Sequence, residues 1–103
     1  MNNIENYSIK QQVIIRTYSA GVFYGEVQEK SSEEVILVNA RRMREWKNIS
    51  DGISLSSISK HGIHPNSVIE EPINSILLQW VEIIPCTREA ITTFDFQPNA
   101  KVK

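Results

Sequence analysis

Three strand-like runs with short links between them dominate the first forty residues of this 103-residue chain. Residues 12–18, 22–28 and 34–39 are rich in β-branched and aromatic side chains, and apolar positions alternate with a period of two. Gly21 can supply a positive φ in the first link, and the polar residues 29–33 form the second. Links this short join neighbouring strands in antiparallel order. The sequence therefore predicts an N-terminal three-stranded antiparallel meander.

A long C-terminal strand completes the predicted sheet. Residues 76–84 are apolar on both faces apart from Gln79 and Glu82, a pattern that favours a central position. Residues 68–71 predict a short edge strand, because Pro72 follows and cannot donate a backbone hydrogen bond to a neighbour. We expect the long strand to join the meander in one sheet.

Two short helices are expected beside this sheet. Residues 54–61 carry apolar side chains three apart, and Gly62 is placed to end that helix. Thr87 can cap a final helix whose buried side we expect to be Ala90, Ile91 and Phe94. Residues 41–51 follow neither pattern. The predicted fold class is α+β, an antiparallel sheet with two short helices.

The length of the chain fits one domain, residues 1–103, with a folded part at about residues 9–96 and both termini frayed. A domain this small buries a modest share of its surface, so we expect a homodimer or a higher homo-oligomer. Cys86 is alone, which excludes a disulfide within the chain and agrees with a reducing cytoplasm. The N-terminal residues do not resemble a secretory signal, and no apolar stretch has the length of a membrane span. We therefore expect a cytoplasmic protein.

Positive charge is concentrated in one part of a nearly neutral chain. The formal net charge is −1, yet residues 39–64 contain five Lys or Arg against two Asp or Glu. A net charge near zero gives no general attraction to nucleic acid or membrane. A local basic patch on such a chain suits a small anionic ligand better than a long polyanion.

The basic patch contains the first candidate binding residues. Arginine presents a planar fork of donors that matches phosphate oxygens, and tryptophan offers a face on which a base can stack. The sequence places Asn39, Arg41, Arg42 and Trp46 within eight positions, a combination that suits a nucleotide pocket. On an extended chain Arg41 and Arg42 point in opposite directions, so we expect only one to face a ligand. The alternative is a solvated arginine rim with Trp46 in the core.

Two further segments contribute candidates. Arg16, Tyr18, Ser19 and Phe23 surround the small residues of the first link, where a ligand can approach the backbone. A plain hairpin explains the same residues without a ligand. A second pair of candidates lies where a strand runs into a helix N-terminus, a place that can hold an anion; these residues are Thr87 and Arg88.

No catalytic or metal-binding constellation is evident. His61 and His64 have the spacing of half a zinc site, but Cys86 would be the only further ligand we can name. Glu70 and Glu71 are adjacent, so on a strand they point to opposite faces and form no acid–base pair. The chain also contains no glycine-rich phosphate loop. We expect a protein that is not an enzyme and that needs no cofactor and no metal.

Three short segments resemble a known family. Residues 13–22 (VIIRTYSAGV), residues 39–42 (NARR) with 46–47 (WK), and residues 82–87 (EIIPCT) occur in this order. Together they resemble the small phage-encoded Thoeris anti-defence sponges of the first type, over about residues 12–94. The resemblance implies a homo-oligomeric nucleotide-binding phage protein that acts at the host–virus interface. Such a protein is a Thoeris inhibitor that sequesters a cyclic ADP-ribose isomer without cleaving it. It implies pockets at the subunit interface and, in some members, a separate site for cyclic oligonucleotides.

Two other classes remain open. The chain can also be a nucleic-acid-binding phage protein with an SH3-like or OB-like β-barrel, whose binding would depend steeply on salt. A purely structural phage protein is the third possibility. The site we expect under the sponge reading comprises Arg16, Tyr18, Ser19, Phe23, Asn39, Arg41, Arg42, Trp46, Thr87 and Arg88.

Overall fold

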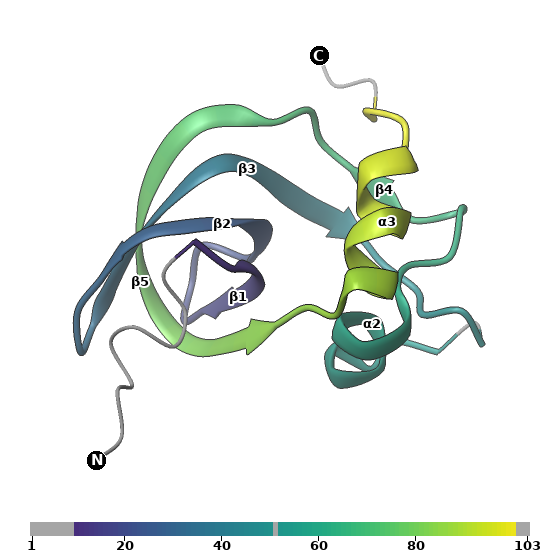
Figure 1. Cartoon of the computed structure of the whole chain (residues 1–103), viewed down its shortest axis with the longest axis horizontal. Coiled ribbons are helices and arrows are strands. Elements are labelled where there is room, and N and C mark those ends of the chain that lie inside the picture. Colours follow the sequence, from purple (N-terminus) through teal and green to yellow (C-terminus); the bar gives the residue numbers. More distant parts are fainter. Residues whose placement is uncertain (1–9, 51, 101–103) are drawn as a thin grey trace.

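The computed structural model describes residues 10–50 and 52–100. In this part of the chain an antiparallel sheet of five strands is accompanied by two helices (Figure 1). The strands are β1 (Gln12–Thr17), β2 (Val22–Lys30), β3 (Glu34–Glu45), β4 (Val68–Ile69) and β5 (Ile73–Pro85). The helices are α2 (Leu55–His61) and α3 (Arg88–Phe96). The predicted α+β class and the N-terminal antiparallel meander are confirmed.

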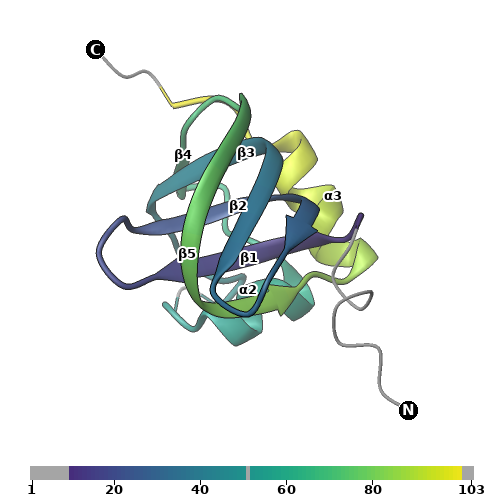
Figure 2. The same ribbon diagram turned by 90° about the vertical axis from the view of Figure 1, so that its left-hand side faces the viewer.

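The sheet closes on itself into a small barrel. β1 pairs with β2 and β5, β2 pairs with β3, and β3 pairs with β5, so four strands form a ring. β5 makes the closure possible because Ile73 to Gln79 pair with β3, whereas Trp80 to Pro85 pair with β1. Figure 2 shows β5 crossing in front of β1, β2 and β3, with both helices behind the sheet. The predicted central position of residues 76–84 is therefore confirmed.

β3 is longer than the sequence predicts. We expected it to end at Asn39, but it continues to Glu45. Asn39 adopts a positive φ of 51°. At this point Tyr24 and Glu26 of β2, two residues apart, pair with Arg41 and Val38 of β3, which are three residues apart. The extra residue forms a bulge, which breaks the alternation by which the strand was recognised. Gly25 lies opposite, where an added Cβ would be 3.1 Å from the Ala40 Cα.

Two apolar cores lie on the two faces of the β1–β2 hairpin. One fills the barrel, and its buried members are Val13, Ile15, Phe23, Val27, Val35, Leu37, Ala40 and Leu78. The other lies under the helices, and its buried members are Ile14, Val22, Tyr24, Met43, Ile58, Ile63, Ile69 and Phe94. Because successive strand residues point to opposite faces, β1 and β2 supply side chains to both cores.

Both helices begin and end close to the positions that the sequence predicts. The Ser54 hydroxyl accepts a hydrogen bond from the Ser57 N–H at 3.1 Å, and the Thr87 hydroxyl accepts one from the Ala90 N–H at 3.1 Å. Gly62 ends α2 with a φ of +104°. Of the expected buried side of α3, Ala90 and Phe94 are fully buried and Ile91 is half-buried.

The segment after α3 is held against the barrel, whereas we expected the chain to fray after Phe96. The Ala100 N–H donates to the Ile69 carbonyl at 2.8 Å, and the Gln97 side chain donates to the Ser67 carbonyl at 2.8 Å. These contacts are hydrogen bonds, whereas the expectation of fraying was based on the small number of apolar side chains after Phe96. The expected fraying of the chain before about residue 9, and of residues 101–103, lies outside the described residues.

Candidate functional site

The turn between β1 and β2 is fixed by one threonine. The Thr17 hydroxyl accepts from the Ala20 N–H at 2.9 Å and donates to the Gly21 carbonyl at 2.8 Å. Gly21 has a φ of +102°, which a residue with a Cβ rarely adopts. In this turn Tyr18 and Ser19 point toward solvent, and 92% of the Tyr18 surface is exposed.

Arg42 lies against this turn. Its guanidinium carbon is 4.4 Å from the centroid of the Phe23 ring, and Nη1 donates to the Ala20 carbonyl at 2.7 Å. The register of β2 and β3 places Phe23 opposite Arg42, which explains the stacking. Phe23 is only 1% exposed, so the face of its ring is covered by the arginine. Arg42 itself is exposed and keeps donors open to solvent.

Arg16 lies on the opposite face of the hairpin. Its Nε donates to Glu82 Oε1 at 2.9 Å, and both side chains are about half exposed (47% and 49%). The pairing of Arg16 with Glu82 follows from the register of β1 and β5. We call Arg16, Tyr18, Ser19, Phe23 and Arg42 the hairpin site.

Arg41 points away from Arg42, as the alternation of a strand requires. Only 7% of the residue is exposed. Its guanidinium donates to the carbonyls of Glu70, Phe94 and Gln97 at 2.8, 2.8 and 3.1 Å, and to Pro98 O and Asn99 Oδ1. Burial lowers the pKa of Arg41 from its ordinary value. Arg41 therefore joins β3 to α3 and to the C-terminal segment.

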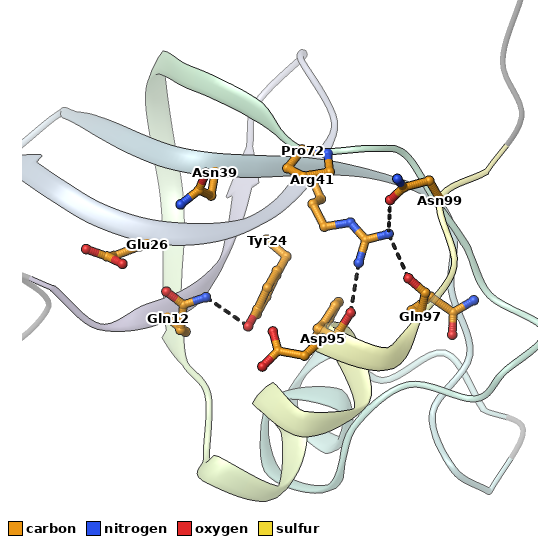
Figure 3. Close-up of a pocket in the computed structure, with 10 residues that line it drawn as sticks. Gln12, Tyr24, Glu26, Asn39, Arg41, Pro72, Asp95, Gln97 and Asn99 are labelled. Carbon is orange, nitrogen blue, oxygen red and sulfur yellow. Dashed lines mark hydrogen bonds between the residues drawn. The ribbon is translucent and has the colours of Figure 1, made fainter.

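A pocket of about 420 Å³ lies between the barrel and the C-terminal segment (Figure 3). The strands supply one wall, and α3 with the residues after it supplies the other. We call it the C-terminal pocket, and its lining residues are Gln12, Tyr24, Glu26, Asn39, Arg41, Pro72, Phe94, Asp95, Gln97 and Asn99. It contains two of the residues that the sequence suggested, Asn39 and Arg41.

The base of the C-terminal pocket is a stacked aromatic pair. The rings of Tyr24 and Phe94 are parallel within 6° and their centroids are 3.8 Å apart. The Tyr24 hydroxyl accepts from Gln12 Nε2 at 2.9 Å (Figure 3). Burial raises the pKa of Tyr24 to about 12, so the hydroxyl stays protonated at neutral pH.

The remaining candidates lie apart from the hairpin site. Trp46 packs on the core under the helices and its Nε1 donates to the Ile53 carbonyl at 3.3 Å. Thr87 caps α3 and also donates to the Lys60 carbonyl at 2.7 Å. Arg88, the first residue of α3, is exposed. The structure thus divides the ten candidates between the hairpin site, the C-terminal pocket and the helix layer.

The histidines and the cysteine do not gather. Within residues 10–50 and 52–100, no three His, Cys, Asp or Glu side chains come close enough together to hold a metal ion. His64 Nδ1 instead accepts from the Asn66 N–H at 3.1 Å. Burial raises the pKa of Cys86 to about 12, which keeps the thiol protonated and a poor nucleophile.

Sequence reasoning missed most of the C-terminal pocket. Gln12 and Glu26 are paired across β1 and β2, and Tyr24 pairs with Ile14. The position of the turn at Gly21 sets this register, so these neighbours could have been found from the sequence. Asp95 and Asn99 reach the pocket only through the packing of α3, for which the sequence contains no local signal.

The fold and the sites define a small antiparallel α+β domain with a closed sheet. A family model described as "Domain of unknown function (DUF6948)" matches residues 10–94, and the chain belongs to this family. No curated protein matches the chain, and no solved structure matches it. Among the described residues, no helix is long and apolar enough to cross a membrane.

Proposed function

We propose that this protein is a phage anti-defence sponge. It binds a cyclic ADP-ribose immune signal of the glyco-cyclic type and sequesters it without cleavage, so that Thoeris immunity is blocked in the cytoplasm of the infected bacterium. The protein acts by affinity alone, without a cofactor or a metal. Cyclic oligonucleotides, bound at a separate site, belong to the same proposal.

The observation that carries this proposal is the meeting of three distant segments at the hairpin site. Arg42, in the segment of residues 39–42, contacts Ala20 and Phe23. Ala20 belongs to the segment of residues 13–22, and Phe23 directly follows that segment. Glu82, in the segment of residues 82–87, forms a salt bridge with Arg16, in the segment of residues 13–22. The segments that carry the family resemblance are therefore joined at the β1–β2 hairpin, with Arg42 on one face and the Arg16–Glu82 pair on the other, although more than 60 residues separate Arg16 from Glu82 along the chain.

The chemistry of this surface suits a cyclic dinucleotide-like ligand. Arg42 is held in place by the Phe23 ring and the Ala20 carbonyl, so a phosphate meets an ordered donor set that keeps its charge. Tyr18 offers an open ring to a base, and the Ser19 hydroxyl lies beside it for a ribose. Phe23 supports Arg42 in this proposal and is not itself the stacking platform.

A second copy of the chain would complete the site. The outer face of β5 carries a row of exposed apolar side chains, in which Ile73, Leu77 and Val81 are 47%, 59% and 46% exposed. Ile36, the β3 partner of Leu77, is half-buried beside this row. Both helices lie on the other side of the barrel (Figures 1 and 2). We propose that this row is the homodimer contact, because pairing two copies removes it from water.

Binding without chemistry is sufficient for a sponge. A dissociation constant between micromolar and nanomolar corresponds to roughly −8 to −12 kcal/mol. Charge-assisted hydrogen bonds from arginine and one stacked base, shielded by a second subunit, can supply a free energy of this size.

The test is a calorimetric titration of the protein with glyco-cyclic ADP-ribose, with cyclic dinucleotides titrated in parallel. Arg42→Ala should weaken binding of the ADP-ribose isomer by roughly 30- to 150-fold, since about 2–3 kcal/mol of charge-assisted contact is lost. The matched control is Arg44→Ala, an exposed arginine two residues along the same strand. An equal effect of both substitutions, or none, contradicts the placement of the site.

The closed barrel favours one alternative, a nucleic-acid-binding phage protein. Binding of a polymer weakens by about 0.7–0.9 log units per log unit of salt for each phosphate contacted. A titration with single-stranded oligonucleotides at two salt concentrations separates the alternatives. Tight, steeply salt-dependent binding of the oligonucleotide, with none of the cyclic ADP-ribose isomer, would replace the sponge by this alternative.

A further inference from the structure

The C-terminal pocket differs in its chemistry from the hairpin site. Its only cationic lining residue is Arg41, and it also contains the carboxylates of Glu26 and Asp95. The formal charge of the lining is therefore −1, whereas an anion site needs a positive excess. A pocket of about 420 Å³ is within the size range of sites for small organic molecules.

Arg41 contributes charge to this pocket but few free donors. Its Nε, Nη1 and Nη2 all donate to backbone carbonyls or to Asn99 Oδ1. Turning the guanidinium toward an entering anion would break these bonds and leave buried carbonyls unpaired, at a large cost. A phosphate or carboxylate ligand is therefore disfavoured here.

The polar groups that stay free in the lining are mostly acceptors. Within the described part of the chain, the carboxylates of Glu26 and Asp95 form no hydrogen bond and no ion pair. Gln12 uses its Nε2 to bind Tyr24, which leaves its Oε1 as an acceptor, and Asn39 keeps its amide oxygen. Figure 3 shows Gln12 and Asp95 on either side of the Tyr24 hydroxyl. Because both walls of the pocket carry free hydrogen-bond acceptors, a ligand with hydrogen-bond donors fits it best.

We propose that the C-terminal pocket binds a small organic cation with a primary ammonium group, such as one end of a polyamine. An ammonium group has three donors and one positive charge, so it can bind up to three of these four acceptors and it balances a lining charge of −1. Tyr24 and Phe94 at the base of the pocket and Pro72 at its rim give the attached methylene groups an apolar contact. This site is independent of the sponge function and of the hairpin site.

Calorimetric titration of the full chain with putrescine and with spermidine tests the proposal. We expect saturable binding with one ligand per chain, weakened about tenfold by Glu26→Gln and by Asp95→Asn, because each removes a charge-assisted contact. Glu29→Gln on β2 and Glu89→Gln on α3 are matched controls, since both carboxylates are exposed and lie outside the pocket. Arg42→Ala should bind both amines as the parent does.

Three results would overturn the proposal. The first is the absence of saturable binding of either amine. The second is equal weakening by the pocket variants and the control variants, which indicates general charge attraction. The third is displacement of the amine by magnesium chloride at an ionic strength where sodium chloride has no effect, which indicates an inorganic cation site. None of these results bears on the binding of cyclic ADP-ribose.

Discussion

Arg41 and Arg42 are neighbours in the chain, but they serve opposite faces of β3. Arg41 is buried and donates to carbonyls of α3 and of the segment after it, whereas Arg42 is exposed beside the β1–β2 turn. The alternation of a strand predicts that the two point in opposite directions. Which of them lies inside depends on where α3 docks, and no local pattern of residues specifies that.

This difference predicts separate effects on stability. Arg41→Ala should lower the free energy of unfolding by about 2–4 kcal/mol, because several buried carbonyls lose their donor. Arg42→Ala should lower it by less than about 1 kcal/mol, since the side chain is exposed. Urea denaturation followed by tryptophan fluorescence measures both. Equal losses for the two variants would show that Arg41 does not hold the C-terminal segment in place.

Two buried acidic groups predict a loss of stability at alkaline pH. Burial raises the pKa of Tyr24 to about 12 from an ordinary value near 10, and that of Cys86 to about 12 from an ordinary value near 9. The unfolded chain therefore releases these protons at a lower pH than the folded chain. Stability is full well below pH 9 and falls as the pH rises toward 12, by about 2–3 kcal/mol for Tyr24 and about 4 kcal/mol for Cys86.

Denaturation at pH 8.5 and at pH 11 measures this slope, and Tyr24→Phe isolates one part of it. The variant should lose stability at pH 8.5, because Gln12 loses its partner, and should show a smaller decrease between the two pH values. Cys86→Ala should reduce the decrease in the same way. A decrease that is unchanged in both variants would assign the alkaline sensitivity to other groups.

At the scale of elements, the strands with regular alternation were predictable and the irregular one was not. β1 and β2 show the period-two pattern, and the central part of β5 is a nearly continuous apolar run. β3 does not, because the bulge at Asn39 shifts the alternation and places Ala40 in the barrel core. The arginine-rich residues after Asn39 therefore did not resemble a strand, although they pair with Phe23 and Tyr24.

The contact between α2 and α3 depends on one glycine. Gly62 has a φ of +104°, and a Cβ added there would clash with the Thr93 side chain. Gly21 has a similar φ of +102°, but the nearest atom to an added Cβ is Arg42 Nη1 at 3.7 Å. Backbone strain of about 1–2 kcal/mol applies to both positions, whereas the clash applies only to Gly62.

Gly62→Ala should therefore destabilise the protein by about 1–3 kcal/mol more than Gly21→Ala does. Thermal denaturation of the two variants under the same conditions makes the comparison. The double variant Gly62→Ala, Thr93→Ser removes one of the clashing groups and should recover part of the loss. Equal melting temperatures for the two single alanine variants would mean that the helices shift apart at little cost.

At the scale of the whole molecule, a closed barrel entered the sequence analysis only with the nucleic-acid-binding alternative. It requires the two halves of β5 to pair with β3 and with β1, contacts between residues far apart in the chain. The apolar residues on both faces of β5 correctly indicated a central strand. Within the described chain, however, no element covers Leu77 and Val81 on the outer face of this strand.

This open row predicts how the molecule assembles. Leu77→Lys places a charge in the middle of the row and should convert a dimer into a monomer with little change in fold, because Leu77 is 59% exposed in the single chain. Thr92→Lys, at an exposed position of α3 on the other side of the barrel (Figure 1), is the matched control. Sedimentation velocity at micromolar concentration measures the mass. A parent protein that is already monomeric there would contradict the proposed contact.

Recovery of the bound molecule tests the central claim most directly. The purified protein is incubated with glyco-cyclic ADP-ribose and freed of unbound ligand. It is then heated until it denatures, and the supernatant is analysed by chromatography. The sponge proposal predicts no ligand in solution before heating and intact, uncleaved ligand afterwards, with recovery reduced in Arg42→Ala. Recovery of a cleaved product would identify an enzyme, and ligand that stays in solution throughout would rule out sequestration.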